Sequence, residues 1–471
     1  MRFRPFLALF VLAVASAASA DIHFGLVETS DPHHYYRSSG LTSFEVRFEG
    51  DVELSTDRES VAALPAGSSL EIRRRNLFTT RMVRVTPDAN GRPTVRYWVG
   101  DRAGSAADAK DFLARNLPEV ARVTTVGARA EARRLAALGP NRLLDAISPL
   151  ESTDAQEIYF EEFLKIRPAD AATGKRAIEI AAREISSSSG LKRILLDLAR
   201  NLPPDPTLTE ALARACVEIS SSSQSAAALS GIAQTRGVPA SAAREYAHAI
   251  REISSSSEKA GAIERVAASA PDSASIELLA EAAESIASSS EMRRALSSLM
   301  GRPGLSPEAV ARILTAGAKI SSSSEKSLLL CASAPRAAGA PEGRRAYLET
   351  ARTIESSSET RRALEALLRP DLGIDGLTAV LKAARGIESS SQKAELLVAA
   401  AARPLPEPAF HAYLECAAGI DSTSEKGRAL RILLARPDLS PEQKKSVMDF
   451  AEREISSSSE REAVLHAAVA R

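Results

Sequence analysis

The chain has 471 residues, 44% hydrophobic and 25% charged, which is enough for two domains or one long array. Its 60 basic and 60 acidic side chains cancel, which argues against a nucleic acid or an anionic membrane surface as the partner, since both favour a basic excess. Aromatic residues make up only 4%, so stacking platforms for bases or sugars are not expected.

Residues 1–20 have the pattern of a secretory signal peptide. Arg2 and Arg4 precede an apolar run over residues 6–14, and small residues then lead to a predicted cleavage between Ala20 and Asp21. No later stretch approaches the length of uninterrupted apolar residues that a membrane-spanning helix needs. We therefore expect a periplasmic or secreted protein with no membrane-spanning segment in the mature chain.

The mature N-terminus divides into a polar segment and a region of alternating hydrophobicity. Residues 21–40 show no helix or strand periodicity and are predicted to be a flexible tail, although His23, His33 and His34 leave a metal site conceivable. Residues 41–104 alternate apolar and polar side chains around turns, which predicts a small β domain. Residues 105–170 are predicted to be linking helices and a degenerate first repeat, joining this domain to the C-terminal part of the chain.

The remainder, residues 171–471, is a repeat array. A single Ile recurs nine times at intervals of 33 to 35 residues, and close variants of Ile-Ser-Ser-Ser-Ser-Glu surround it. The second residue after each Ile is always Ser, and the fifth is Glu or Gln in eight of the nine copies. This spacing predicts a capping box, in which the Ser hydroxyl accepts a backbone N–H and the carboxylate returns to the Ser N–H. The predicted cap residues are Ser187, Ser221, Ser255, Ser288, Ser322, Ser356, Ser389, Ser422 and Ser457.

Each repeat contains two predicted helices. The first follows the cap serine and carries Leu or Ile ten positions after the repeat Ile, whereas the second runs up to the next Ile with large and small side chains at helical spacing. Neither helix can bury its apolar stripe alone, so the units must stack. The predicted fold is mainly α, a right-handed α-solenoid of HEAT-like or TPR-like αα repeats preceded by the small β domain. Cys216 and Cys416 occupy columns of small core residues, whereas Cys331 falls in a variable column.

Two groups of motifs resemble a known family. The first group lies before the array, and the second is the Ile-x-Ser-x-x-Glu core of the repeat with its following Leu. The residues of the first group are Gly50-Asp51-Val52-Glu53-Leu54, Arg96-Tyr97-Trp98-Val99-Gly100-Asp101, Phe112-Leu113, Asn116-Leu117-Pro118, Arg122, Arg133 and Leu144. Together they are similar to the extracytoplasmic β-plus-helical-repeat region that follows the peptidase in some bacterial sensor-transducer, antirepressor-type metallopeptidases. The resemblance implies the fold, but the His-Glu-x-x-His zinc motif and membrane helices of those relatives are missing from this sequence, so their peptidase activity is not implied.

The sequence contains no recognisable catalytic or cofactor-binding constellation. The repeat serines are explained by capping, no Gly-x-Ser-x-Gly elbow or phosphate-binding glycine loop is present, and the array histidines fall in different columns. We therefore expect no cofactor and a non-catalytic protein-binding scaffold, whose partner is another extracytoplasmic protein. A regulatory or structural envelope component and an uncharacterised enzyme are the alternatives. Variable exposed columns of the second helices form the predicted binding face, represented by Glu245, Arg312, Arg345 and Lys382.

Overall fold

The computed structural model describes residues 26–31, 33–166 and 170–469. The chain divides into two compact units, with the boundary between Glu162 and Phe163. The predicted cleavage site between Ala20 and Asp21 lies outside the described residues.

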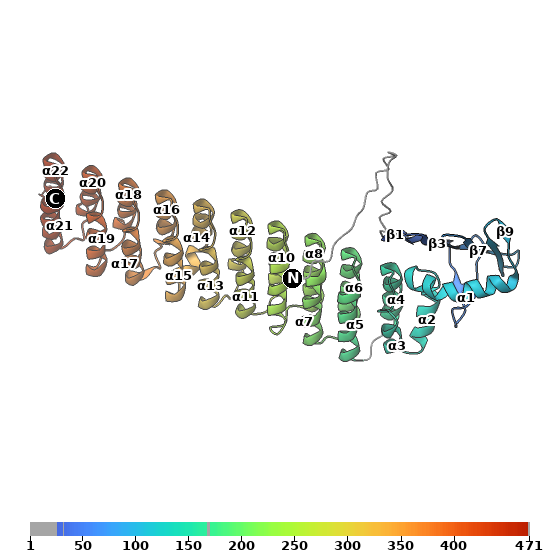
Figure 1. The fold of residues 1–471 in the computed structure, drawn as a ribbon. Helices are drawn as coiled ribbons and strands as arrows, with labels where there is room; N and C mark the ends of the chain where they lie inside the picture. Colours follow the sequence, from blue (N-terminus) through green and yellow to red (C-terminus); the bar gives the residue numbers. More distant parts are fainter. Residues whose placement is uncertain (1–25, 32, 167–169, 470–471) are drawn as a thin grey trace, which may run out of the picture. The chain divides into compact units, whose positions relative to one another are not determined.

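An antiparallel sheet forms the first unit. Seven strands pair in the order β1-β2-β3-β6-β7-β8-β9, and β4 and β5 form a separate two-stranded sheet (Figure 1). The strands are β1 (Leu26–Asp31), β2 (His34–Ser39), β3 (Thr42–Glu49), β4 (Glu53–Leu54), β5 (Val61–Ala63), β6 (Ser69–Arg75), β7 (Thr80–Pro87), β8 (Pro93–Val99) and β9 (Arg102–Ala103).

Alternation along the strands gives the sheet one apolar face. On β3, Phe44, Val46 and Phe48 are buried, and the residues between them are polar. Helix α1 (Ala106–Val123) packs on this inner face, with the rings of Tyr97 and Phe112 5.4 Å apart. The remaining helices of this unit are α2 (Ala128–Ala137), α3 (Pro140–Asp145) and α4 (Thr153–Lys165), the last of which crosses the boundary between the units.

The prediction of a flexible tail over residues 21–40 is wrong for the part that the structure describes. Residues 26–31 and 34–39 form β1 and β2, and β2 pairs along its whole length with β3. Tyr35 is buried against Phe44 because the strand register places them on the same inner face. Strand pairing and one anchoring aromatic ring therefore order a segment whose own hydrophobicity is low.

The second unit is the helical array. Its second helices are α5 (Ala171–Glu184), α7 (Pro206–Ala215), α9 (Ala243–Glu252), α11 (Ser273–Ala283), α13 (Pro307–Gly317), α15 (Pro341–Ala351), α17 (Gly373–Ala384), α19 (Glu407–Ala418) and α21 (Pro441–Glu454). Its first helices are α6 (Ser188–Asn201), α8 (Ser222–Arg236), α10 (Ser256–Ala268), α12 (Ser289–Met300), α14 (Ser323–Ala337), α16 (Ser357–Leu367), α18 (Ser390–Ala401), α20 (Thr423–Leu434) and α22 (Ser458–Val469). A short 3₁₀ turn, Cys216–Glu218, follows α7.

The two sets of helices form two layers, in which each helix packs on the equivalent helix of the next repeat (Figure 1). All nine repeat isoleucines are at most 7% exposed and cover the junction between a second helix and the following first helix. The Leu or Ile ten positions later is completely buried in eight repeats, and Leu465 in the last helix is partly exposed because no further repeat covers it among the described residues. The predicted α-solenoid of αα repeats is confirmed.

The cysteines follow the repeat columns. Cys216 and Cys416 are fully buried, whereas Cys331 is half-buried, and all three are free thiols. Burial raises the pKa of the Cys416 thiol to about 12, and it raises that of Cys216 as well. Both behave as small core residues that are kept protonated by the surrounding apolar side chains.

Candidate functional site

The cap serines begin the first helices as the spacing indicates. Ser255 Oγ accepts a hydrogen bond from Glu258 N at 3.4 Å. The same bond, 3.2 to 3.5 Å long, is made by Ser187, Ser288, Ser322, Ser356, Ser389, Ser422 and Ser457. Ser221 Oγ makes no such bond to the described backbone and lies 3.3 Å from Ser223 Oγ.

The capping box also predicts that the Glu or Gln side chain accepts a bond from the cap Ser N–H. This prediction is wrong in five repeats, because the cap N–H donates to a serine of the preceding repeat instead. Ser255 N donates to Ser222 Oγ at 3.3 Å, and Ser222 belongs to the preceding repeat. Bonds of 3.2 to 3.3 Å connect Ser188 to Ser221, Ser289 to Ser322, Ser357 to Ser389 and Ser390 to Ser422 in the same way. We call Ser188, Ser222, Ser289, Ser357 and Ser390 the serine relay. A hydroxyl of one repeat thus satisfies an otherwise unpaired donor at the next helix N-terminus.

Buried lysines connect the two helices within a repeat. Lys259, Lys326, Lys393 and Lys426 are at most 7% exposed. Each lies on a first helix, and its Nζ donates to the backbone carbonyl at the end of the second helix of the same repeat, as Lys393 does to Gly419 O at 2.6 Å. Burial lowers the pKa of Lys259 and Lys326, although nearby Glu252 and Glu355 respectively oppose the shift. A cation at a helix C-terminus complements the helix dipole, so these lysines act as C-caps.

Arginines at the ends of first helices connect the interhelical loops. Arg236 donates to the carbonyls of Ala199, Leu202 and Pro203 in the preceding repeat, and Arg302 donates to Ala270 O at 3.2 Å. Arg336, Arg403 and Arg436 make equivalent bonds. The serines and arginines of the regular columns thus bond neighbouring repeats, and the lysines bond the two helices of one repeat. This leaves the irregular columns for other contacts.

The predicted binding face contains two kinds of residue. Arg214 bonds Glu245 at 3.2 Å, and Arg312 bonds Glu284 at 2.7 Å, so Glu245 and Arg312 belong to ion pairs between successive second helices. Arg345 differs, because its side chain is 75% exposed and reaches only Glu349 at 4.0 Å. Lys382 is exposed and forms no ion pair with the described residues. Arg345 and Lys382 are thus the members whose charge is available to a partner.

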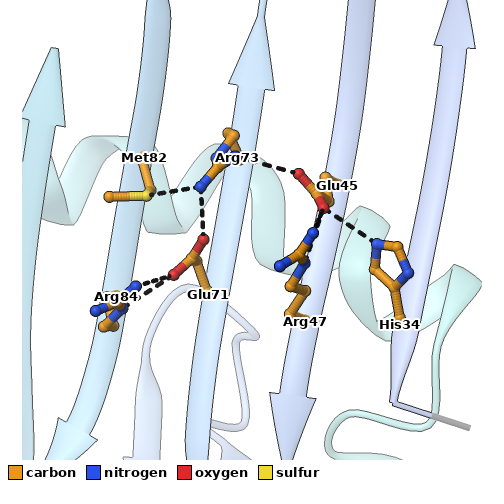
Figure 2. Close-up of polar contacts among 7 residues, drawn as sticks. All are labelled: His34, Glu45, Arg47, Glu71, Arg73, Met82 and Arg84. Atoms are coloured by element: carbon orange, nitrogen blue, oxygen red, sulfur yellow. Dashed lines mark hydrogen bonds and ion pairs between the residues drawn. The ribbon is translucent and has the colours of Figure 1, made fainter. Parts of the chain in front are cut away.

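The outer face of the sheet carries a network of ion pairs (Figure 2). The carboxylates of Glu45 and Glu71 lie at its centre, with side chains only 13% and 14% exposed. The groups around them, at 2.6 to 3.6 Å, belong to His34, Arg47, Arg73 and Arg84. Two carboxylates on this face thus bond three arginines and one histidine.

Within the described parts of the chain, no group of three or more His, Cys, Asp or Glu side chains is arranged to hold a metal ion. His23, one of the three histidines considered for such a site, lies outside those parts, and His34 bonds Glu45 at 3.1 Å. A search of the described helices for membrane spans finds none that is long and apolar enough.

Comparisons with known proteins give little beyond this geometry. Neither a family model nor a curated protein matches the chain. One solved structure that is similar to part of it is described as a "Circular tandem repeat protein with novel repeat topology and enhanced subunit contact surfaces", with 16% identity over 76% of this chain and 73% of that chain. The TM-score is 0.14, so the description of the fold rests on this chain's own helices.

Proposed function

We propose that this protein is a non-catalytic scaffold of the periplasm or the extracellular space, and that its array binds another extracytoplasmic protein through the second helices. The observation that carries the proposal is the contrast between columns. Serines and arginines of the regular columns bond neighbouring repeats, and the lysines bond the two helices of one repeat. Arg345 and Lys382, by contrast, project from second helices, and among the described residues their ion pairs are limited to that of Arg345 with Glu349 at 4.0 Å. Stacked repeats of this kind present extended surfaces suited to protein partners.

The resemblance to sensor metallopeptidases supports a second candidate, a regulatory or structural component of the cell envelope. Both candidates require export, which the pattern of residues 1–20 favours. The two candidates, a scaffold and an envelope component, differ in the purpose of the binding, and in neither does this chain catalyse a reaction.

A paired charge reversal tests the proposal. Arg345→Glu with Lys382→Glu should abolish capture of the partner in a crosslinking pull-down while leaving the circular dichroism spectrum unchanged. Arg362→Glu with Arg428→Glu is the matched control, because both are exposed arginines on first helices that bond a Glu three residues earlier, at 3.8 and 3.3 Å. Capture that survives the first pair and fails with the second would place the binding surface on the first helices.

A further inference from the structure

The sheet's inner face ends in an arginine-lined cleft that the scaffold function does not use. The cleft has a volume of about 830 Å³ and lies between α1 and the end of the sheet where the β2–β3 and β6–β7 turns are found. Five arginines line it, with Asp108 the acidic residue among the lining groups. They are Arg37, Arg74, Arg75, Arg81 and Arg115.

Strand register brings three of these arginines, Arg37, Arg74 and Arg81, into one row. Arg37 pairs with Phe44, Phe44 with Arg74, and Arg74 with Arg81 across four neighbouring strands. Directly paired residues point to the same face of a sheet, so three guanidinium groups share one row with a phenylalanine. Like charges directly opposite one another destabilise a sheet, and Arg74 and Arg81 form such a pair, so the pairing of the strands does not explain Arg81 at this position.

The arrangement also leaves positive charge uncompensated. Glu119 bonds both Arg37 and Arg74, and the Arg74 guanidinium lies 4.3 Å from the centre of the Phe44 ring. Arg75 and Arg81 form no ion pair with the residues that the structure describes. On the outer face, by contrast, Glu45 and Glu71 bond the neighbouring arginines (Figure 2). The cleft is therefore a pre-arranged site for an anion, and the guanidinium fork suits phosphate or carboxylate.

Large apolar side chains project from the turns beside the cleft. Leu41 is 50% exposed, Leu77 is 56% exposed and Phe78 is 90% exposed. Their neighbours Thr42, Asn76 and Thr79 line the cleft itself, and the pairing of Ser43 with Arg75 puts the two turns side by side. We call Leu41, Leu77 and Phe78 the apolar tips.

We propose that this end of the sheet docks on an anionic phospholipid bilayer, with a lipid phosphate in the arginine cleft and the apolar tips inserted among the acyl chains. A soluble acidic peptide would fill the cleft and leave the tips in water. A bilayer accommodates both features, because it places anionic headgroups directly above an apolar layer. The neutral charge of the whole chain does not oppose this docking, since the attraction acts locally and falls off within a Debye length.

Vesicle sedimentation with the full chain tests the proposal. The protein should sediment with vesicles of phosphatidylcholine mixed with phosphatidylglycerol, but not with phosphatidylcholine alone, and added salt should weaken the binding. Arg75→Glu with Arg81→Glu should lower the affinity by more than about tenfold, since each arginine near an anionic surface contributes roughly a fivefold gain. Phe78→Ser should lower it by about tenfold or more, because the buried ring returns to water.

Arg92→Glu with Arg96→Glu is the matched control. Arg92 lies on the β7–β8 turn at the opposite end of the sheet, Arg96 lies on the outer face, and both are exposed. This pair should bind as the unchanged protein does. Sedimentation that is equal with neutral and anionic vesicles, or unaffected by Arg75→Glu with Arg81→Glu, would overturn the proposal. Binding of poly-glutamate without sedimentation on any vesicle would overturn it in favour of an acidic protein ligand.

Discussion

Replacing Ser222 tests the serine relay most cleanly. Its hydroxyl accepts the Ser255 N–H at 3.3 Å and bonds Ser254 Oγ at 2.7 Å, so Ser222→Ala removes both bonds between the repeats. The cap of α10 stays in place, because Ser255 Oγ itself makes it. An intramolecular hydrogen bond contributes about 1 kcal/mol net. We therefore expect Ser222→Ala to lower the free energy of unfolding by about 1 kcal/mol, as much as the loss of an ordinary helix cap.

Ser256 provides the matched control for this substitution. It holds the same helix position one repeat later, but the following repeat has Ala287 in place of the first serine. Among the described residues, the Ser256 hydroxyl forms no hydrogen bond to the next repeat. Ser256→Ala therefore causes the same change in helix propensity without breaking a relay bond, and its cost should be close to zero.

Hydrogen exchange read by mass spectrometry measures the effect locally, alongside urea unfolding followed by circular dichroism. In Ser222→Ala, the amides of residues 253–258 should exchange about fivefold faster, which corresponds to about 1 kcal/mol. Local readout is preferable because a repeat array can unfold in stages. Equal costs for Ser222→Ala and Ser256→Ala, with unchanged exchange in residues 253–258, would refute the relay.

Two further predictions concern buried polar groups in the core. Tyr413 OH donates to Ala429 O at 2.9 Å, whereas the buried Tyr246 OH has no partner among the described residues. Urea unfolding should therefore show that Tyr413→Phe lowers the free energy of unfolding by about 1 kcal/mol and that Tyr246→Phe leaves it unchanged. The reverse order would contradict this prediction. Because the fold raises the pKa of the Cys216 and Cys416 thiols above the ordinary 9.0, their contribution to stability is complete below pH 9 and is lost as the pH rises above it. Each thiol should lower the free energy of unfolding by about 1 kcal/mol between pH 9 and 10. A variant with both Cys216→Ala and Cys416→Ala should show a correspondingly shallower decline in urea titrations over this range, and an unchanged slope would contradict the assignment.

The sequence was sufficient for the array because its signals are local and periodic. The repeat Ile, the Leu ten residues later and the cap Ser each act within one helix pair, so their spacing alone locates the elements. The sequence does not predict the acceptor of the cap N–H, because a Glu three residues later and a Ser of the preceding repeat can both accept this bond. The stacking distance between repeats, which the sequence does not contain, makes the Ser of the preceding repeat the acceptor.

The sheet was harder to predict because its signals are not local. The sequence predicts a flexible tail around Tyr35, because the order of this segment comes from pairing with β3 and not from its own composition. The arginine cleft is not predictable from the sequence for the same reason. Arg37, Arg74 and Arg81 are dispersed along the sequence, and strand register alone places them in one row.

Site-specific photocrosslinking in the host cell tests the central claim most directly. A photoreactive amino acid replaces Arg345 on α15 in one variant and Arg362 on α16 in a second, since both side chains are exposed on consecutive helices that belong to different layers. If the second helices bind an extracytoplasmic protein, the variant at 345 should give one discrete adduct and the variant at 362 should give none. An adduct at 362 alone, or no adduct at either position, would contradict the proposed binding face.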